Sequence, residues 1–437
     1  MKFRPSLGLL LTSLMMASCG SFGQPPASAA PASAAITTSS TAASSTAATA
    51  ATQDFATWLS ALRNEALASG ISANTVQSAF ANVNAPLPRV LELDRSQPEF
   101  VQTFTAYMRN RMSDARIARG RALLQKHADL FARLEREYGV QPQYLVAFWA
   151  LESNFGDNTG GFSVVDALAT LAYDPRRADF FRTELLTALR IIDAGHITAN
   201  AMTGSWAGAM GQCQFMPSTF MSYAKDGDGD GRIDLWGSVP DVMTSAANYL
   251  SRSGWQRGER WGREVILPKG FDFTLADTNV RKSVTQWNTL GVRRADGTPL
   301  GASEQLGSIV VPAGAAGPAF LGYGNFQTTM VWNRSIFYAI SVGHLADRFM
   351  GAGPLLHMPV NEQALTRDDV IELQTRLNQL GFDTGTPDGV LGSRTRTAVR
   401  EYQLRHALAA DGYASAAFLA SLRETSPLTP AAGAQPR

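Results

Sequence analysis

The sequence has little cysteine and almost no net charge. Its 437 residues include 2 Cys, at positions 19 and 213, too few for a scaffold of several disulfides or for a cysteine-rich zinc site. The 38 Lys and Arg nearly balance the 37 Asp and Glu, and a net charge of +1 creates no field that favours nucleic acid or anionic lipid. The 38 Gly and 21 Pro show no three-residue period, which excludes collagen. With 45% hydrophobic and 17% charged residues, the composition is that of a globular protein with room for about two to three domains.

Charged residues are also absent between Arg4 and Asp54. Inside this stretch an apolar run from Leu7 to Met16 follows two basic residues and precedes small ones, which is the order of a secretory signal. The run is too short to span a bilayer. We therefore predict a signal peptide at residues 1–19.

The end of this segment, Met16 to Cys19, resembles the processing box of bacterial lipoproteins, in which the Cys carries the lipid. The resemblance implies that Cys19 is lipidated. Because no Asp follows it, it also implies anchoring to the outer membrane, with the protein on the periplasmic side of a Gram-negative-type envelope. Residues 27–52 are Ala, Ser or Thr at all but two positions and cannot bury enough surface to fold. We expect residues 20–53 to be a linker.

The body of the chain, residues 54–350, is predicted to be mainly α-helical, because apolar residues recur at spacings of three and four. Residues 118–138 are one example, closed by a helix-stop Gly139. Between Val265 and Val311 short apolar runs broken by Gly and Pro predict a small β-containing insertion whose strand pairing the sequence does not give. A linker at residues 351–365 and a tail at 425–437 flank a second compact unit at 366–424. The fold class is thus mainly α (α+β).

One glutamate stands out near the end of a well-bounded helix, residues 142–155. Glu152 falls on the same face as Leu145, Phe148 and Trp149, at i, i+3, i+4 and i+7 spacing. Burial favours the neutral form of a carboxyl and raises its pKa, as a general acid at neutral pH requires. The alternative is a partly exposed Glu at a frayed helix end.

Five ordered blocks carry a family resemblance. They are ALESNFG at 150–156, LAYDPRR at 171–177, GSWAGAMGQCQFMPS at 204–218, AANYL at 246–250 and WNRSIFY at 332–338. Together they resemble the B-type family of lytic murein transglycosylases, exported enzymes with a lysozyme-like catalytic core that cleave peptidoglycan glycan strands. The resemblance implies a lysozyme-like catalytic core with a helical N-terminal part at residues 54–350.

By this resemblance, Glu152 is the single catalytic acid and base. It would protonate the oxygen of the β-1,4 bond between N-acetylmuramic acid and N-acetylglucosamine. It would then accept the proton of the muramoyl 6-hydroxyl as that oxygen closes onto C1, which gives a 1,6-anhydromuramoyl end without water. Most glycosidases need two carboxylates, but an internal nucleophile removes the need for the second.

The other blocks imply residues that bind the substrate. Amide, hydroxyl and aromatic groups would contact sugar hydroxyls, acetamido groups and apolar sugar faces: Ser205, Gln214, Tyr249, Asn333, Tyr338 and, outside the blocks, Tyr107. Arg176 and Arg177 would hold the muramic lactyl carboxylate or the attached peptide. For the aromatic residues, core packing is the alternative. We interpret Cys213 as a packing residue and not as a nucleophile.

A loop of alternating Asp and Gly starts at residue 226. Asp226, Asp228 and Asp230 occupy loop positions 1, 3 and 5 of an EF-hand pattern, with Gly at position 6 and Ile at position 8. Position 12 is Gly and not Glu, so Asp241 is the expected carboxylate from outside the loop. A similar unusual calcium site belongs to the family that the chain resembles. We expect a structural Ca²⁺ held by Asp226, Asp228, Asp230, the Arg232 carbonyl and Asp241; the alternative is a solvated acidic turn.

The C-terminal unit has its own helical pattern. Val370, Leu373 and Leu377 form one helix face, and residues 395–404 form a second helix after an Asp-Gly turn. These features, with the Phe418-Leu419 pair, resemble the small peptidoglycan-binding domain of cell-wall enzymes, which implies a separate domain of three helices. We expect peptidoglycan and, through the lipid anchor, the membrane as partners, no nucleic acid, no organic cofactor and a monomeric chain.

Two other functions stay open at this point. A hydrolytic muramidase would need a second positioned carboxylate, such as Asp157 or Asp166. A protein that binds the cell wall without cleaving it would need neither, although the intact blocks around Glu152 argue against that.

Overall fold

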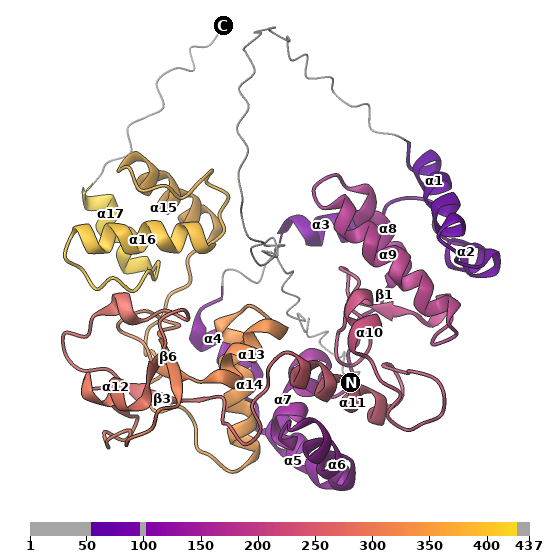
Figure 1. Ribbon diagram of the computed structural model, residues 1–437. Coiled ribbons are helices and arrows are strands. Elements are labelled where there is room, and N and C mark those ends of the chain that lie inside the picture. The colour runs from indigo at the N-terminus through magenta and orange to yellow at the C-terminus, as the bar shows by residue number, and fades with distance from the viewer. Residues whose placement is uncertain (1–53, 97–101, 426–437) are drawn as a thin grey trace, which may run out of the picture.

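The computed structural model describes residues 54–96 and 102–425, and this part of the chain is mainly helical (Figure 1). The predicted signal peptide with Cys19, the linker of residues 20–53 and the tail from residue 426 lie outside the described residues. Across the described ranges, no helix has both the length and the apolar character needed to cross a bilayer.

Most of the helices form one body that contains the largest apolar core. Their bounds are α1 (Phe55–Ala68), α2 (Ala73–Ala79), α3 (Pro88–Ser96), α4 (Phe104–Arg111), α5 (Asp114–Lys126), α6 (Ala128–Tyr138), α7 (Pro142–Ser153), α8 (Val164–Tyr173), α9 (Ala178–Asp193), α10 (Pro217–Tyr223), α11 (Val239–Arg252), α13 (Gly324–Trp332) and α14 (Ile336–Phe349). Strands β1 (Phe162–Ser163) and β2 (Thr203–Gly204) form a short antiparallel pair beside α8.

Helix α7 lies at the centre of this body, in contact with α5, α6, α11 and α14. Pro142 begins it and Asn154 ends it in the left-handed conformation, at φ 51°. The sequence predicted one apolar face, but nearly all of α7 is buried on every side, since four helices surround it. A side chain near the end of α7 is therefore buried by the whole bundle and not by a single face.

The single helix predicted at residues 118–138 is two helices. Helix α5 ends at Lys126 and α6 begins at Ala128, because the backbone of His127 departs from helical geometry at φ −111° and ψ 29°. The His127 ring packs edge-on against Phe131 and Trp149, so the break lets both helices contact α7. The predicted stop at Gly139 is confirmed, with a left-handed φ of 77°.

The predicted β-containing insertion is a five-stranded sheet with its own small core. Its elements are β3 (Gly262–Ile266), β4 (Lys282–Ser283), α12 (Val284–Thr289), β5 (Arg293–Arg294), β6 (Leu306–Val310) and β7 (Ala319–Gly322). The order is β4-β6-β7-β3-β5 with antiparallel neighbours, and Gly262 and Val265 of β3 pair with Gly322 and Ala319 of β7. This sheet separates α11 from α13 along the chain.

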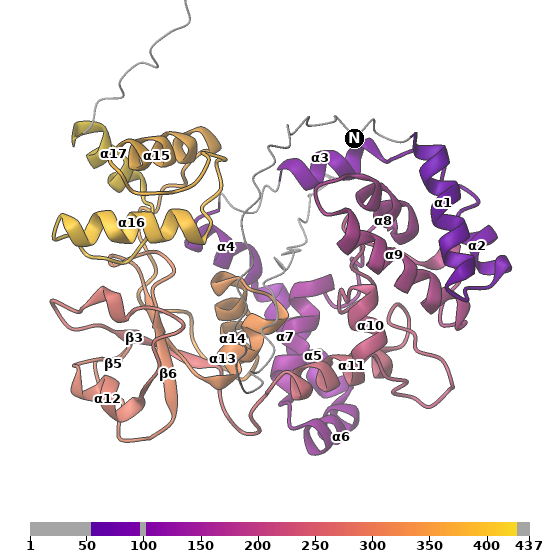
Figure 2. The ribbon, with the colours of Figure 1, turned by 45° about the horizontal axis from the view of Figure 1, so that its top comes forward.

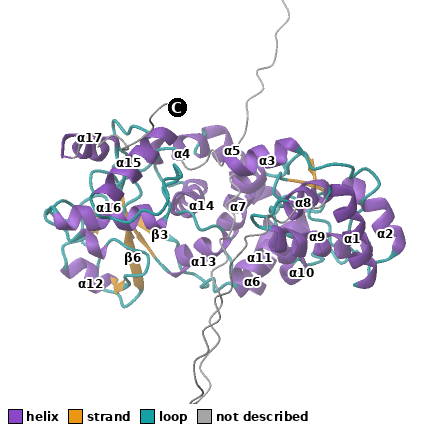
Figure 3. Ribbon diagram, turned by 90° about the horizontal axis from the view of Figure 1, so that it is seen from above, coloured by secondary structure: helices purple, strands orange, loops and turns teal. Residues whose placement is uncertain are grey.

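The C-terminal unit consists of α15 (Arg367–Gln379), α16 (Ser393–Arg405) and α17 (Ala416–Thr425) around a separate core that includes Leu373, Val399 and Leu422. Residues 351–366 contain no helix or strand. Figure 2 places these helices over the larger sheet, and Figure 3 shows that sheet on the same side of the molecule as α15 to α17. The predicted mainly helical fold with a small sheet and a separate helical unit is confirmed.

Candidate active site

Glu152 lies in the last turn of α7 and is only 6% exposed. Its Oε1 atom accepts two hydrogen bonds from side chains that are about 180 residues away in the sequence. The indole Nε1 of Trp332 donates at 2.8 Å, and the hydroxyl of Tyr338, which is buried in α14, donates to the same oxygen. Within the described residues Oε2 receives no hydrogen bond. One carboxylate oxygen is therefore held in place and the other can carry a proton.

Burial raises the pKa of Glu152 to about 7. The hydrogen bonds from Tyr338 and Trp332 oppose this rise because they stabilise the carboxylate, and the positive charge of Arg111 opposes it further. A carboxyl with a pKa near neutrality exists in both protonation states at pH 7. It can therefore donate a proton and later accept one, as a general acid and base must.

Aromatic side chains surround this carboxyl. The ring of Trp332 lies 4.6 Å from that of Phe148, 4.9 Å from that of Tyr249 and 5.5 Å from that of Phe215, measured between centroids. The hydroxyl of Tyr249 lies 3.5 Å from the Val331 carbonyl. Tyr249 and Trp332 are partly exposed, so they can present ring faces to a ligand while also packing against the core.

Ser205 and Gln214 belong to the loop between β2 and α10. The Ser205 hydroxyl accepts hydrogen bonds from the amides of Ala207 and Ala209, at 3.3 and 3.0 Å. Gln214 has a left-handed φ of 51°, and its amide nitrogen donates to the carbonyls of Thr159 and Gly211 at 3.0 and 2.8 Å. Its buried Oε1 atom has no hydrogen-bond partner in the described part of the chain. This acceptor fits an N–H or O–H group of a ligand.

Asn333 lies between α13 and α14, and Tyr107 lies on α4. Asn333 is buried, and its Oδ1 atom accepts a hydrogen bond from the Ser335 amide at 3.1 Å, at the start of α14. The ring of Tyr107, from α4, packs edge-on against Phe337 with centroids 5.4 Å apart. The Arg111 guanidinium lies over the ring of Tyr107, 3.3 Å from its centroid. Tyr107 also contributes to the electrostatic environment of Tyr338, which places α4 beside the site.

Arg176 and Arg177 are engaged in ion pairs. Both guanidinium groups contact the buried carboxylate of Asp94 in α3, and Arg176 also contacts Asp174 at 3.0 Å. Arg177 lies over the ring of Phe181, 5.1 Å from its centroid. Both arginines thus join α3 to the turn between α8 and α9 through ion pairs with Asp94. The structure does not bring them into the hydrogen bonds around Glu152.

Neither alternative carboxylate is arranged like Glu152. Asp157 is exposed and forms an ion pair with Arg119, whose hydrogen bond lowers the pKa of Asp157. Asp166 lies in the first turn of α8, and its backbone amide donates to the Ser163 hydroxyl. Neither side chain forms a hydrogen bond with Glu152 or its two donors.

Cys213 is buried beside Glu152 and has no disulfide partner among the described residues. Burial and the neighbouring charge of Glu152 raise the pKa of the Cys213 thiol far above its usual range. A thiol with so high a pKa is a poor nucleophile, which agrees with a packing role.

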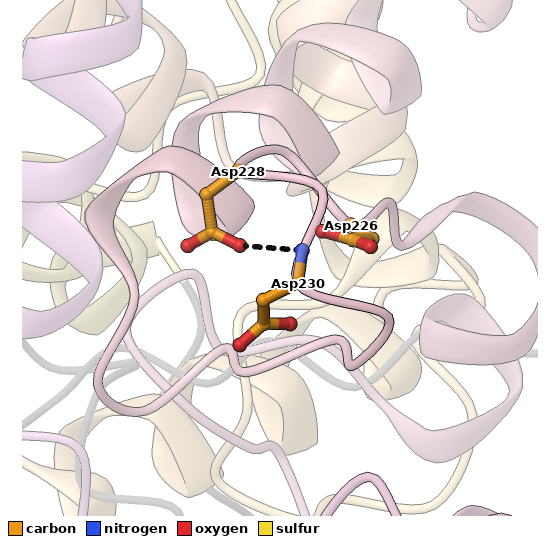
Figure 4. A group of neighbouring side chains, drawn as sticks. All are labelled: Asp226, Asp228 and Asp230. Carbon is orange, nitrogen blue, oxygen red and sulfur yellow. Dashed lines mark hydrogen bonds between the residues drawn. The ribbon is translucent and has the colours of Figure 1, made fainter.

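The Asp-Gly loop lies on the surface next to α11. The carboxylates of Asp226, Asp228 and Asp230 can place oxygen atoms within 4.8 Å of one another, and Asp228 accepts a hydrogen bond from the Asp230 amide (Figure 4). The Arg232 amide donates to Asp230 at 2.8 Å. Three clustered carboxylates repel one another unless a cation balances them, and Ca²⁺ prefers such oxygen ligands.

Asp241, the predicted carboxylate from outside the loop, is buried in the first turn of α11. Its two oxygens accept hydrogen bonds from the amides of Gly227 and Asp234, at 2.8 and 2.6 Å. Asp241 thus fixes the loop to the start of α11 through these two amides, and it is not one of the three clustered carboxylates.

Two residues at this site were missed by the sequence reasoning, Trp332 and Arg111. Trp332 is the first residue of the block at 332–338, and its place in that block was the one sequence feature that could have marked it as a site residue. Nothing in the block distinguishes a hydrogen-bond donor from a core residue. Arg111 lies four residues after Tyr107 on α4, and only tertiary packing brings its charge near Glu152.

The chain is similar to known proteins over most of its described length. Residues 54–347 match the Transglycosylase SLT domain, and residues 366–422 match a peptidoglycan binding domain. The membrane-bound lytic murein transglycosylase B of Escherichia coli is 33% identical over 247 residues, which are 55% of this chain and 66% of that protein. Other curated relatives match over only 55 to 66 residues. One of them is the N-acetylmuramoyl-L-alanine amidase CwlM from Mycobacterium tuberculosis, of whose length the match covers 14%.

Solved structures are similar over as much as 85% of the chain. SltB3 from Pseudomonas aeruginosa, solved in complex with NAG-anhNAM-pentapeptide, is 44% identical, with a TM-score of 0.81 over 85% of this chain and 100% of that one. The Escherichia coli lytic transglycosylase Slt35, solved in complex with calcium, is 28% identical, with a TM-score of 0.59 over 67% of this chain and 92% of that one. The helical body thus has the lysozyme-like fold that the family resemblance implied. By its fold and its match over residues 54–347, the chain belongs to the transglycosylase SLT domain family.

Proposed function

We propose that the protein is a lytic transglycosylase that cleaves peptidoglycan with Glu152 as its only catalytic carboxyl. The observation that carries this proposal is the environment of Glu152: a buried carboxyl, a pKa of about 7, and two donors on Oε1 that leave Oε2 available for the proton. Neither Asp157 nor Asp166 shares this environment. An internal nucleophile in the substrate makes a second carboxylate unnecessary.

The reaction then proceeds in two proton transfers. Oε2 of Glu152 donates its proton to the glycosidic oxygen as the bond from that oxygen to C1 of muramic acid breaks. The carboxylate that results is stabilised by the hydrogen bonds from Tyr338 and Trp332. The muramoyl 6-hydroxyl oxygen bonds to C1 and returns its proton to Glu152, so no water is consumed.

Substrate contacts follow from the groups that line the site. The unpartnered Oε1 of Gln214 fits an acetamido N–H or a sugar hydroxyl. Tyr249, which is partly exposed, offers its ring to sugars, while Ser205 and Asn333 hold the backbone that shapes the site. A sugar contact of Tyr107 stays a prediction, because its ring is buried and covered by Arg111. Contacts of Arg176 and Arg177 with a muramic carboxylate stay a prediction, and they require a carboxylate that can compete with Asp94.

The test is mass spectrometry of peptidoglycan digested with residues 54–437. We expect products with 1,6-anhydromuramoyl ends, each lighter than a hydrolytic product by one water. Glu152→Gln should lower the rate by roughly 10²–10⁴-fold, because the amide keeps the shape and cannot exchange the proton. Asp157→Asn and Asp166→Asn are matched controls that should retain cleavage.

Other outcomes would point elsewhere. Reducing muramic ends, together with activity lost in Asp157→Asn or Asp166→Asn, would identify a hydrolytic muramidase. Binding to peptidoglycan without any cleavage would identify a wall-binding protein. Cleavage by Glu152→Gln at the wild-type rate would refute the catalytic assignment.

We also propose that the loop at residues 226–241 binds a structural Ca²⁺. Asp226, Asp228, Asp230 and the Arg232 carbonyl would be ligands. Asp241 would become a ligand by giving up its hydrogen bonds from the loop amides and binding the ion instead. Removing the ion with a chelator should lower Tm, since a ligand bound only to the folded state stabilises it. Asp228→Asn should lower Tm in calcium and should abolish the effect of the chelator. An unchanged Tm after chelation would contradict the calcium proposal.

The surrounding architecture completes the proposal. Residues 54–350 would be the catalytic domain and residues 366–424 a peptidoglycan-binding domain, joined by a linker. The activity would lie on the periplasmic side of the envelope, with Cys19 as the lipid anchor, and it would need no organic cofactor. A Cys19→Ser variant of the full chain should leave the membrane fraction if the anchor exists.

A further inference from the structure

Within the described ranges, two groups of polar contacts link the C-terminal unit to the rest of the protein. In the first, Arg400 of α16 forms an ion pair with Asp277 at 3.2 Å, and the Asp411 carboxylate accepts a hydrogen bond from the Ala315 amide at 2.7 Å. These two contacts attach the unit to the β-containing insertion. They involve no residue of the helical body that surrounds Glu152.

The second contact is different because it reaches α4. Glu362 lies in the segment between α14 and α15, and its carboxylate accepts hydrogen bonds from the amides of Phe104 and Thr105, at 3.2 and 2.8 Å. These are the first residues of α4, whose free amides and helix dipole favour a negative charge. The hydroxyl of Tyr413, from the C-terminal unit, donates to Glu362 Oε1 at 2.8 Å. One carboxylate thus joins α4 to the C-terminal unit.

Helix α4 in turn packs against α14, which carries Tyr338. Phe104 and Tyr107 both pack edge-on against Phe337, with ring centroids 5.3 and 5.4 Å apart. Met108 accepts a hydrogen bond at its sulfur from the Ser341 hydroxyl at 3.2 Å. Helix α4 therefore contacts the residue just before Tyr338 and a residue one turn after it, and the hydroxyl of Tyr338 donates to Glu152.

The same helix ends at Arg111, whose guanidinium is stacked on the ring of Tyr107. The charge of Arg111 favours the carboxylate form of Glu152. A small movement of α4 would therefore change both the packing behind Tyr338 and the charge near Glu152.

We propose that Glu362 is a positioning residue for catalysis, and that with Tyr413 it holds α4 against α14 so that Arg111 and Tyr338 keep their places around Glu152. The C-terminal unit would then take part in setting the reactivity of the catalytic carboxyl, besides binding the cell wall. This inference rests on the proposed function, since it takes Glu152 to be the catalytic acid.

A pH profile distinguishes this role from simple attachment. The titratable and charged groups that face Glu152 are Arg111 from α4, Tyr338 from α14 and Cys213 from the loop after β2. Burial raises the pKa of both Tyr338 and Cys213, so neither ionises near neutrality. Withdrawal of Arg111 would remove a charge that favours the carboxylate and would raise the pKa of Glu152. Because the acid must be protonated, the alkaline limb of activity would move to higher pH.

The experiment compares four full-length proteins: wild type, Glu362→Ala, Tyr413→Phe and Arg400→Ala. For Glu362→Ala we expect kcat to fall by roughly three- to tenfold with KM within about twofold. We also expect the alkaline limb of the pH–activity profile to shift to higher pH by about half a unit, and hydrogen exchange of the amides in residues 104–111 to accelerate. Tyr413→Phe should show the same changes to a smaller extent. Arg400→Ala removes the contacts with Asp277 and the Ala276 carbonyl, and one long hydrogen bond of 3.4 Å to the Asp411 carbonyl, but it leaves Glu362 and the Tyr413 hydroxyl in place, so it should match the wild type in all of them.

Several results would overturn the inference. One is a Glu362→Ala protein with the wild-type pH profile and wild-type exchange in α4, and another is an Arg400→Ala protein that changes as much as Glu362→Ala. A Tyr413→Phe protein identical to the wild type would exclude a role for the C-terminal unit. If Glu362→Ala does not fold, Glu362→Gln, which keeps one acceptor, should give the intermediate effect. Amide exchange needs no activity, so it tests whether Glu362 holds α4 even if the chain fails to cleave peptidoglycan, and it separates failure of this inference from failure of the proposed function.

Discussion

At the scale of single residues, the proposed chemistry depends on keeping Glu152 protonated at a pH where an exposed Glu would be ionised. Burial provides this by raising the pKa to about 7 from 4.5. The donors Tyr338 and Trp332 limit the rise, so the carboxyl can still ionise when the reaction needs it. The balance between burial and hydrogen bonding therefore sets the reactivity of the site.

This balance has a cost in stability, which Glu152→Gln should reveal. The folded pKa lies above the unfolded one, so the folded state retains a proton that the unfolded state releases, and stability falls as pH rises from 4.5 to about 7. Above that range the penalty is about 3 kcal/mol. Because Gln cannot ionise, the variant should be more stable than the wild type at pH 8 and no more stable at pH 4. Urea denaturation at both pH values checks this, and an equal difference at both would contradict it.

The sequence predicted the burial of Glu152 from its position on a helix with apolar neighbours, and the structure confirms it. The family blocks implied Tyr338 as a sugar-binding residue, whereas the structure shows its hydroxyl donating to Glu152. The sequence could not identify Trp332 as a hydrogen-bond donor or Arg111 as a nearby charge. Trp332 ends α13 and Arg111 ends α4, and both reach Glu152 only through packing between elements that are distant in the sequence. Side-chain type and spacing within one helix carry no information about such contacts.

At the scale of elements, the short strands show why the sheet could not be paired from the sequence. All residues of β7 and most residues of β6 are buried, whichever face of the sheet they lie on. Neither strand therefore shows the alternation of apolar and polar residues that would fix its register. Strand β3 pairs with β7 across more than 50 intervening residues, and no turn signal encodes that pairing. Helix bounds were more accessible, because Pro142 and Gly139 mark them locally.

Close packing of α14 leads to a prediction about Gly343. A Cβ atom at this position would lie 2.0 Å from the Trp261 ring, so the helix can approach the start of β3 only without a side chain. Gly343→Ala should therefore destabilise the protein by about 1–3 kcal/mol, even though Ala favours helix by about 1 kcal/mol over Gly. Gly353→Ala, where the space is open, should change stability by less than about 0.5 kcal/mol. Denaturant unfolding of both variants measures the difference, and equal effects would contradict the packing argument.

At the scale of the whole molecule, the existence of a separate C-terminal helical unit was predictable and its contacts with the rest of the protein were not. The sequence predicted a separate C-terminal unit from its own helical periodicity, and the unit has a core of its own. The contacts of Arg400 with Asp277 and of Glu362 with α4 join residues more than 100 positions apart. A composition of balanced charge gave no sign of them.

Because the C-terminal unit has its own core, removing it should separate binding from cleavage. The cut belongs after Ala364, since Leu365 is part of the C-terminal core while Glu362 must stay on α4. A second binding module raises the effective concentration of the first on a polymer. We therefore expect the truncated chain to bind insoluble peptidoglycan about tenfold more weakly, measured by sedimentation.

Cleavage of short soluble glycans, in contrast, should persist in the truncated chain. It should do so at a reduced rate, because the truncation removes Tyr413 but leaves Glu152, Tyr338 and Trp332 in place. Full-length Arg400→Ala is the control for loss of the contact with the insertion. Undiminished sedimentation of the truncated chain would place the main wall-binding surface in the catalytic body, and complete loss of soluble activity with the fold intact would make the C-terminal unit part of the catalytic machinery itself.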